Sequence, residues 1–422
     1  MKIAHINGLL PKPNKDTYLA GYFPPRKWQD IHQELTFSIV LIDSGIQKII
    51  LGSLDTLFLD EQFLSDLRRR LDKDIVLMLF ATHTHNAPSL CKSTPDLGPV
   101  CEDYYQDTIS IIVSAIDNLI LKSLKKVNLS FDQVPSNLSI NRRKYSWALD
   151  YKLLTKGKFS FKKQVCLSKN KFGAIDSSIK SLIFRDNCNN PKVVVWSLAA
   201  HAAFFPRFKS ISPDFPGMVR KMLQSKYGDQ LTVIYLPGFA GSGIPNYKAK
   251  IFPKLRFRTF VSWVLPFKPS LPSYSMTNYK KFASEIFKKI FLQVERINKP
   301  DISKEVTFSK KKFEKIFISK KGDLINKDLN LYILSFDDKF RLLATNGEMI
   351  SEWYEELNVV NHSKIIFSSY ITGDCLYIPT AREIMRGGYE VNGFQKYFSM
   401  NGDFSDEMLV NVKKEFFLEI DR

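Results

Sequence analysis

Two histidines stand one residue apart in the segment ATHTHNAP, residues 81–88, directly after the apolar run IVLMLF. The chain has only six histidines among 422 residues, so this spacing is unusual within the sequence. Side chains alternate along a β-strand, and a strand that ends in His-x-His therefore directs His83 and His85 to the same face. The pair is consistent with a metal site at the mouth of a strand and also with two polar residues that begin a loop.

Three further segments place chemically useful residues at the ends of predicted strands. KVVVWSLAAH ends in His201, IYLPGFAGSGIPN leads from a strand into a turn of small residues, and Glu348 follows the strand-like run RLLAT. Each has a plain structural interpretation as well. His201 suits a buried core histidine, the turn suits a close backbone approach, and Glu348 suits a first-turn glutamate that complements a helix dipole.

Strand-like and helix-like runs alternate along the chain, which predicts an α/β fold. We expect a hairpin over 35–55, helices over 60–72, 104–124, 214–228 and 277–297, and strands over 75–81, 126–134, 177–186, 192–201, 231–237 and 365–371, with two more strands within about 328–346. Residues 351–358 read as a short helix, 373–390 as loop-rich and 404–419 as a helix or strand. Repeats and obvious linkers are lacking, so residues 1–422 are predicted to form one large domain of mixed β-sheets flanked by helices.

The net charge of +18 is the strongest signal in the composition. Such a charge suits nucleic acid, an anionic membrane surface or an anionic substrate, and it also suits lysines spread over solvated faces. A basic and aromatic insertion at about 248–276 lies within a stretch from 230 to 284 that has no acidic residue. It is predicted either to meet a membrane headgroup region or polyanionic ligand, or to be an ordinary surface insertion.

Targeting signals are not recognised in the sequence. The apolar runs are far shorter than the roughly 18–20 residues of a membrane span, and the N-terminus lacks a signal-peptide pattern. The five cysteines are scattered, with no CxxC pair, and are expected to be reduced thiols. We therefore expect a cytoplasmic protein, with peripheral membrane contact through 248–276 left open.

ATHTHNAP resembles the Thr-His-Thr-His-Ser-Gly-Pro signature of neutral (alkaline, non-lysosomal) ceramidases. Six more segments resemble elements of that family in the same order, over about residues 1–395: the hairpin ending in LGSLD, SINRR, VVVWSLAAHAAFF with SPDFPGMVRKML, YLPGFAGSGIPN, NGEMISEW, and YIPT with GGYE. Each segment is modest alone, but their common order is specific. The resemblance implies the catalytic fold of that family and a zinc-dependent amide hydrolase.

The resemblance also implies a role for individual residues. The Zn²⁺ ligands fall on His83, His201, Glu348 and Tyr377. His85 matches a histidine that transfers a proton, and Tyr389 a tyrosine that donates a hydrogen bond at the scissile carbonyl. Arg142 matches a substrate-binding arginine, Gly241 and Ser242 lie in the glycine-rich turn predicted to contact substrate, and Asp214 is expected to orient a ligand or cap its helix.

The glycine-rich turn departs from the family pattern. Ile244 stands where the family has a serine, and Ser242 stands where it has an aspartate. Zinc-activated water is therefore the expected nucleophile, and Ser242, two residues before the family's serine position, is the alternative nucleophile. A counterpart of the family's C-terminal immunoglobulin-like domain is not recognised either. The resemblance therefore predicts the reaction more strongly than it predicts ceramide as the substrate.

The sequence thus predicts a zinc enzyme that removes an N-acyl group from a lipid, or an acetyl group from a nucleotide- or lipid-linked N-acetylated sugar. The alternative of another class is a non-catalytic protein that binds nucleic acid or a membrane surface. No nucleic-acid-binding motif supports it, so a nucleic-acid partner is not expected.

Overall fold

The computed structural model describes residues 1–71, 74–149, 157, 160–247, 275–296, 305–320, 326–337, 339–357 and 364–421. Residues 248–274 of the predicted basic and aromatic insertion at about 248–276 lie outside this part of the chain, and the contacts of the insertion stay a prediction. The extent of one domain over 1–422 also stays a prediction.

Three large sheets form the body of the protein. The first has the order β7-β6-β5-β1-β8, with β1 (Lys2–Leu9), β5 (Thr36–Asp43), β6 (Lys48–Leu54), β7 (Ile75–Ala81) and β8 (Lys125–Lys126). The second has the order β15-β13-β12-β9, with β9 (Asn128–Pro135), β12 (Ser178–Arg185), β13 (Pro191–Leu198) and β15 (Thr232–Pro237). The third has the order β21-β19-β18-β17-β23, with β17 (Val306–Ser319), β18 (Lys327–Phe336), β19 (Phe340–Thr345), β21 (Ile365–Ser368) and β23 (Gly402–Phe404).

The three sheets share one central core because their strands are apolar on both faces. In β5, Val40 and Ile42 face this core, and the alternate residues Ile39 and Leu41 face the outer helices. β13 and β18 alternate in the same way. Strands buried on both faces read as continuous apolar runs, which is why the sequence predicts them well.

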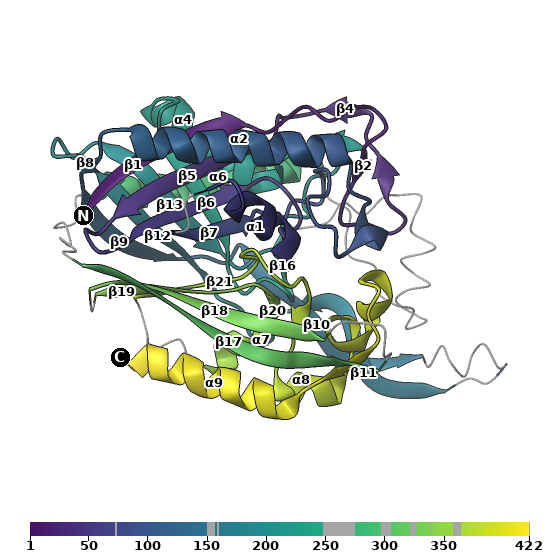
Figure 1. Ribbon diagram of the computed structural model, residues 1–422. Helices are drawn as coiled ribbons and strands as arrows, with labels where there is room; N and C mark the ends of the chain where they lie inside the picture. Colours follow the sequence, from purple (N-terminus) through teal and green to yellow (C-terminus); the bar gives the residue numbers. More distant parts are fainter. Residues whose placement is uncertain are drawn as a thin grey trace.

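Helices cover the outer faces of the sheets. α1 (Glu61–Arg68) and α2 (Glu102–Leu121) cover the first sheet, α4 (Asp214–Tyr227) and α6 (Met276–Glu295) the second, and α9 (Asp406–Asp421) the third. Figure 1 shows α2 and α4 along the top, α9 along the bottom and the sheets between them. Each helix presents an apolar stripe to its sheet, as in α2, where Ile109, Ile112, Ile116 and Leu119 are buried.

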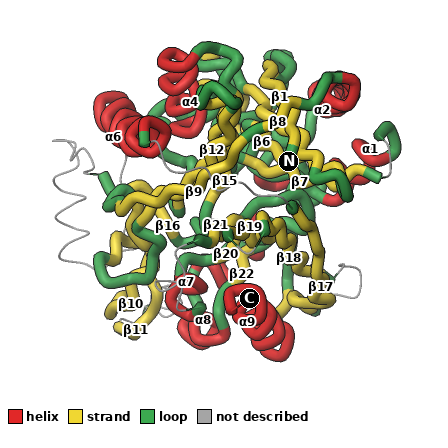
Figure 2. Tube along the Cα trace, turned by 90° about the vertical axis from the view of Figure 1, so that its left-hand side faces the viewer, coloured by secondary structure: helices red, strands yellow, loops and turns green. Residues whose placement is uncertain are grey.

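Shorter elements complete the structure at one end of the sheets. β10 (Ser139–Leu149) pairs with both β11 (Phe161–Asn170) and β16 (Gly243–Pro245), and β20 (Glu348–Met349) pairs in parallel with β22 (Tyr377–Ile378). Figure 2 shows β16, β20 and β22 near one another, with β10 and β11 beyond them. The others are β2 (Tyr18–Leu19), β3 (Arg26–Lys27), β4 (Asp30–Ile31), β14 (Ser210–Ile211), α7 (Glu352–Glu356), α8 (Ala381–Arg386), the π-turn Tyr389–Gly393 and the 3-10 turns Pro95–Leu97 and Gln395–Tyr397.

The predicted α/β class, with mixed sheets flanked by helices, is confirmed. The hairpin at 35–55 is β5–β6, and the four long helices lie within a few residues of their predicted bounds. The loop-rich reading of 373–390 is wrong in part, because α8 begins at Ala381 behind an N-cap from Thr380. None of the described helices is long and apolar enough to cross a membrane, and all five cysteines are free thiols.

Candidate metal centre

The ends of two strands in different sheets bring three histidines together. His83 and His85 follow β7, and His201 follows β13. One ring nitrogen of each lies within 4.8 Å of the other two. His83 and His201 are only 2% and 3% exposed. The structure therefore joins the predicted histidine pair to the third predicted histidine in one buried cluster.

The backbone at this cluster is strained. His83 has a φ of 61°, in the left-handed region that costs a non-glycine residue on the order of 1–3 kcal/mol. Tyr370 has a φ of 63°, and its ring centroid lies 4.1 Å from that of His83. Strain of this kind is concentrated at functional sites, so it marks both residues as candidates for a functional role.

Each of the three imidazoles is oriented by a backbone carbonyl. Nδ1–H of His83 donates to Leu57 at 3.0 Å, that of His85 to Gly21 at 2.9 Å, and that of His201 to Ala240 at 2.7 Å. A carbonyl oxygen only accepts, so Nδ1 carries the proton and each Nε2 keeps its lone pair. Within the described ranges, Nε2 of His83 and Nε2 of His85 are buried and lack a hydrogen-bond partner. A metal ion is the natural partner for such atoms.

Burial keeps the three rings neutral. Desolvation is the largest effect in each case: it lowers the pKa of His85 to about 4 and lowers the pKa values of His83 and His201 well below 6.5. The positive charge of Arg142 lowers all three further. Neutral imidazole is the form that binds a metal, so at neutral pH the cluster is ready to do so.

Glu348 adds a carboxylate to the cluster. Its Oε2 lies 3.7 Å from Nε2 of His83 and 3.5 Å from Nε2 of His201, and it accepts a hydrogen bond from the Tyr370 hydroxyl at 3.1 Å. The side chain is 2% exposed, and this burial raises the pKa of Glu348 to about 8. A carboxyl group in this position needs a nearby cation to stay ionised at neutral pH, which a divalent metal would supply.

Tyr377 lies beside Glu348 because β20 and β22 pair with these two residues in register. Its hydroxyl hydrogen bonds with Glu348 and accepts a hydrogen bond from Nη2 of Arg142 at 3.1 Å. Tyr389 packs edge-on against Tyr377, with ring centroids 5.7 Å apart. Burial raises the pKa of both phenols, so without a metal both are protonated. Arg142, Tyr377 and Tyr389 thus all lie where the sequence analysis expects the active site.

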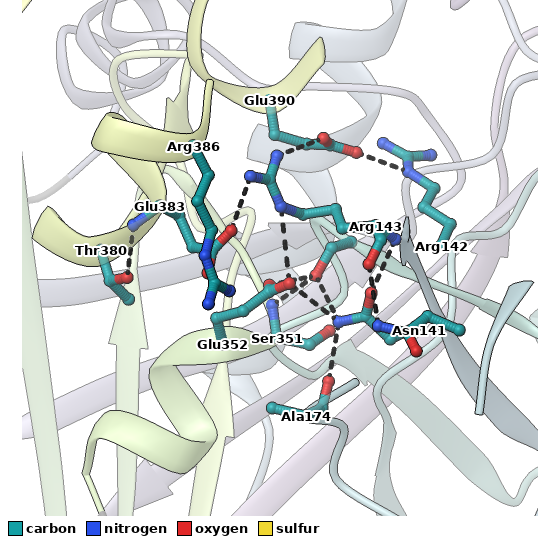
Figure 3. Close-up of polar contacts among 12 residues, drawn as sticks. Asn141, Arg142, Arg143, Ala174, Ser351, Glu352, Thr380, Glu383, Arg386 and Glu390 are labelled. Carbon is teal, nitrogen blue, oxygen red and sulfur yellow. Dashed lines mark hydrogen bonds and ion pairs between the residues drawn. The ribbon is translucent and has the colours of Figure 1, made fainter. Parts of the chain in front are cut away.

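Arg142 is itself held by a buried ionic network (Figure 3). Its Nε donates to Glu390 at 2.8 Å, and Nη1 of Arg143 donates to the other oxygen of Glu390 at 2.7 Å. Arg143 also pairs with Glu383 at 2.8 Å. The guanidinium of Arg142 therefore has fixed partners in the protein, and its predicted contact with substrate stays a prediction.

The glycine-rich turn is part of the same scaffold. The Gly241 carbonyl accepts from Nη2 of Arg142 at 2.9 Å, and a Cβ at Gly241 would come within 2.8 Å of the Glu348 carbonyl oxygen. The Ser242 hydroxyl is fully buried, donates to Glu352 at 2.7 Å and accepts from the Ser351 amide at 2.9 Å. These contacts hold the glycine-rich turn in place beside Arg142 and Glu348. Substrate binding by Gly241 and Ser242 stays a prediction.

Asp214 acts on the loop that follows His201. Its carboxylate accepts backbone N–H groups from Phe204 at 2.7 Å, Phe205 at 2.8 Å and Phe215 at 2.5 Å. These bonds connect the first turn of α4 to the histidine loop, so the predicted role in orienting a ligand is indirect. A direct catalytic role has no contact to support it among the described residues.

Several residues of the site were not predicted from the sequence. Tyr370 contacts Glu348 directly, and Glu352 and Glu390 are buried charges that hold the glycine-rich turn and Arg142. Glu390 directly follows Tyr389, so an acidic residue beside a predicted site tyrosine was an available signal. Tyr370 had no such signal, because it lies within an apolar strand-like run.

The donor set fits zinc. Three neutral imidazoles and a carboxylate, with a tyrosine beside them, are nitrogen and oxygen ligands of the kind that zinc prefers. His85 has its own unpartnered Nε2, so the division between ligand and proton-transfer roles among these residues stays a prediction.

Ceramidases are among the solved structures that are similar to this chain. A neutral ceramidase from Pseudomonas aeruginosa is similar with a TM-score of 0.70 over 99% of this chain and 73% of its own, at 13% sequence identity. A ceramidase complexed with C2 is similar with a TM-score of 0.68 over 99% of this chain and 74% of its own, also at 13% identity. The chain has the neutral ceramidase fold. No protein-family model matches it, and no curated protein sequence is significantly similar.

Within the neutral ceramidase fold, this chain's departure in the glycine-rich turn has a clear structural form. Ile244 lies in β16, pairs with Ile140 of β10 and is only 5% exposed. An apolar side chain therefore packs where the sequence resemblance places a serine, and it offers no hydroxyl.

Proposed function

We propose that this protein is a zinc-dependent amide hydrolase that acts on an N-acyl lipid. The observation that carries the proposal is the buried cluster of His83, His201 and Glu348, with unprotonated Nε2 atoms close to a carboxylate. Its location at strand ends of a neutral ceramidase fold supports the same reaction class.

His83, His201, Glu348 and Tyr377 would hold the ion. Bound zinc supplies Lewis acidity and an activated water near neutral pH. The protein supplies orientation: backbone carbonyls fix the imidazoles, and Arg142 fixes the Tyr377 hydroxyl.

Two further residues would handle protons and developing charge. His85 is neutral at pH 7 because burial lowers its pKa to about 4, so its Nε2 could take a proton from the attacking water and pass it to the departing amine. Tyr389 stays protonated because burial raises the pKa of its phenol, so it can donate a hydrogen bond to the oxyanion. Ser242 is not needed as a nucleophile in this scheme.

The substrate class rests on the fold. Similarity to two ceramidases favours a lipid amide over the alternative of an N-acetylated sugar. The alternative of a nucleic-acid-binding protein has no recognised nucleic-acid-binding motif to support it.

Metal analysis tests the proposal first. The purified protein should contain about one zinc per chain, and His83→Ala and Glu348→Ala should each lose it. His5→Gln is the matched control, because His5 hydrogen bonds with Thr232 and lies outside the cluster. Zinc retained in both cluster variants would refute the assignment of the site.

Amine release tests the reaction. Ceramide, other N-acyl lipids and N-acetylated nucleotide sugars are compared with and without a chelator. Chelator-sensitive release from a lipid amide is expected. Release from the sugar alone would overturn the lipid assignment, and zinc-loaded protein that hydrolyses none of them would overturn the hydrolase assignment.

A further inference from the structure

The β10–β11 hairpin leads from the candidate site to an exposed end. β10 begins beside the glycine-rich turn, where Asn141 pairs with Gly243, and Arg142 follows on the same strand. Among the described residues its far end pairs with β11 alone, and Figure 1 shows this part of the hairpin extending away from the body of the protein. The hairpin therefore connects the site to the protein surface.

One face of the hairpin is aromatic and exposed. Tyr145 and Trp147 are two residues apart on β10, and Phe161 lies opposite the next position on that face. Their exposed fractions are 47%, 63% and 51%. Large aromatic side chains are rarely grouped on an exposed surface without a partner, so this aromatic face of Tyr145, Trp147 and Phe161 is a candidate docking surface.

The surroundings of the aromatic face are basic. Neither strand contains an aspartate or glutamate. Lys163 is exposed and pairs with Trp147 on the aromatic face, whereas Lys144 and Lys162 are exposed on the other face of the hairpin. Arg386 of α8 lies over the Tyr145 ring at 5.6 Å, and Nζ of Lys163 is 5.9 Å from the same ring. Charge complementarity therefore selects an anionic partner.

We infer that the aromatic face docks on an anionic lipid surface. Aromatic rings flanked by lysines are suited to the boundary between headgroups and hydrocarbon, where the ring is buried and the cation meets lipid phosphate. Single-stranded nucleic acid would instead need open ring faces for base stacking. The Tyr145 ring is already flanked by two cations, which favours lipid.

Docking in this orientation would serve the site. Arg142 and Trp147 are five residues apart on one strand, which places them about 17 Å apart. The candidate active site would then lie close to the lipid surface that holds an N-acyl lipid. This inference rests on the proposed function for its purpose, but lipid binding itself is measured without any reaction.

Vesicle sedimentation tests the inference. The full chain is mixed with phosphatidylcholine vesicles and with vesicles that also contain phosphatidylserine. Binding to the anionic vesicles is expected, together with a loss of about tenfold in affinity for the double variant Tyr145→Ser, Trp147→Ser. Lys163→Gln should lose about fivefold, and added salt should weaken binding further.

Leu121→Ser is the matched control, because Leu121 is 84% exposed at the end of α2, away from the hairpin, and should bind as the wild type does. Equal binding by the double variant and the control would overturn the inference. So would binding of a single-stranded RNA oligonucleotide that is lost in the double variant while vesicle binding remains.

A second readout separates this inference from the proposed function. On a short-chain N-acyl substrate dissolved as monomers, the double variant should keep wild-type turnover, and on vesicle-embedded substrate it should lose it. Hairpin-dependent vesicle binding without hydrolysis of either form would overturn the proposed function and leave the inference standing.

Discussion

Replacing Glu390 with glutamine removes a negative charge that pairs with two buried arginines. Glu390 is fully buried and contacts Arg142 at 2.8 Å and Arg143 at 2.7 Å, through one oxygen each. Breaking a buried ion pair from one side typically costs about 3–5 kcal/mol, because the partner's charge is left uncompensated. Glutamine keeps the shape and one acceptor oxygen, so we expect about 3 kcal/mol of lost stability, at the lower end of that range.

Thermal unfolding at neutral pH measures this loss. For a chain of this length, about 3 kcal/mol corresponds to a fall in Tm of roughly 3–4 °C. The control is Glu355→Gln, which breaks an equally short but exposed pair with Arg382 and should cost less than about 0.5 kcal/mol. Equal shifts in the two variants would refute the argument that burial sets the cost.

The pH dependence of the Glu390 effect has a definite sign. Burial alone would raise the pKa of Glu390, but Arg142 and Arg143 outweigh it and hold that pKa below 4.5. The stabilisation is therefore present above the unfolded pKa of about 4.3 and is lost as the pH falls through the folded value. The difference between wild type and Glu390→Gln should be constant near neutrality and shrink in acid. A difference that grows in acid would contradict this reasoning.

Three further predictions follow from the same contacts. Ser242→Ala should retain zinc-dependent turnover but lose about 1–3 kcal/mol of stability, because the buried Glu352 carboxylate loses its hydrogen bond from the Ser242 hydroxyl. Loss of turnover in a folded, zinc-loaded variant would instead support Ser242 as the nucleophile. Gly241→Ala should reduce both zinc occupancy and Tm, because its Cβ would lie 2.8 Å from the backbone oxygen of Glu348. Unchanged metal content would show that the glycine-rich turn shifts without displacing Glu348. Burial and, to a lesser extent, three lysines lower the pKa of His5 to about 4. As the pH falls from 6.5 toward 4, the unfolded state binds a proton at His5 that the folded state does not, so the folded protein loses stability over this range. His5→Gln should therefore show about 1–2 kcal/mol less acid destabilisation than the wild type in urea titrations, a figure reduced for the partial exposure of the ring.

Much of the core could be predicted from the sequence because the apolar runs in the sequence match strands that are buried in the structure. β7 and β13 are buried on both faces, so each appears as an unbroken apolar run, and a histidine directly after such a run is conspicuous. The β10–β11 hairpin and β17 were not predicted. Their exposed positions mix lysines with aromatics, and that composition carries no clear alternation.

By itself, the sequence determined which residue types stand at strand ends: His83, His85, His201 and Glu348 are all recognisable there. Only the tertiary structure decided that they meet, because β7 and β13 belong to different sheets that share the central core, and Glu348 belongs to the separate β20–β22 pair. The tertiary structure also decided the chemical state of these groups. The carbonyls that fix the histidine tautomers, and the burial that shifts the pKa of Glu348, come from segments distant in sequence. Such long-range contacts leave no periodic trace in the chain, so no local pattern can report them.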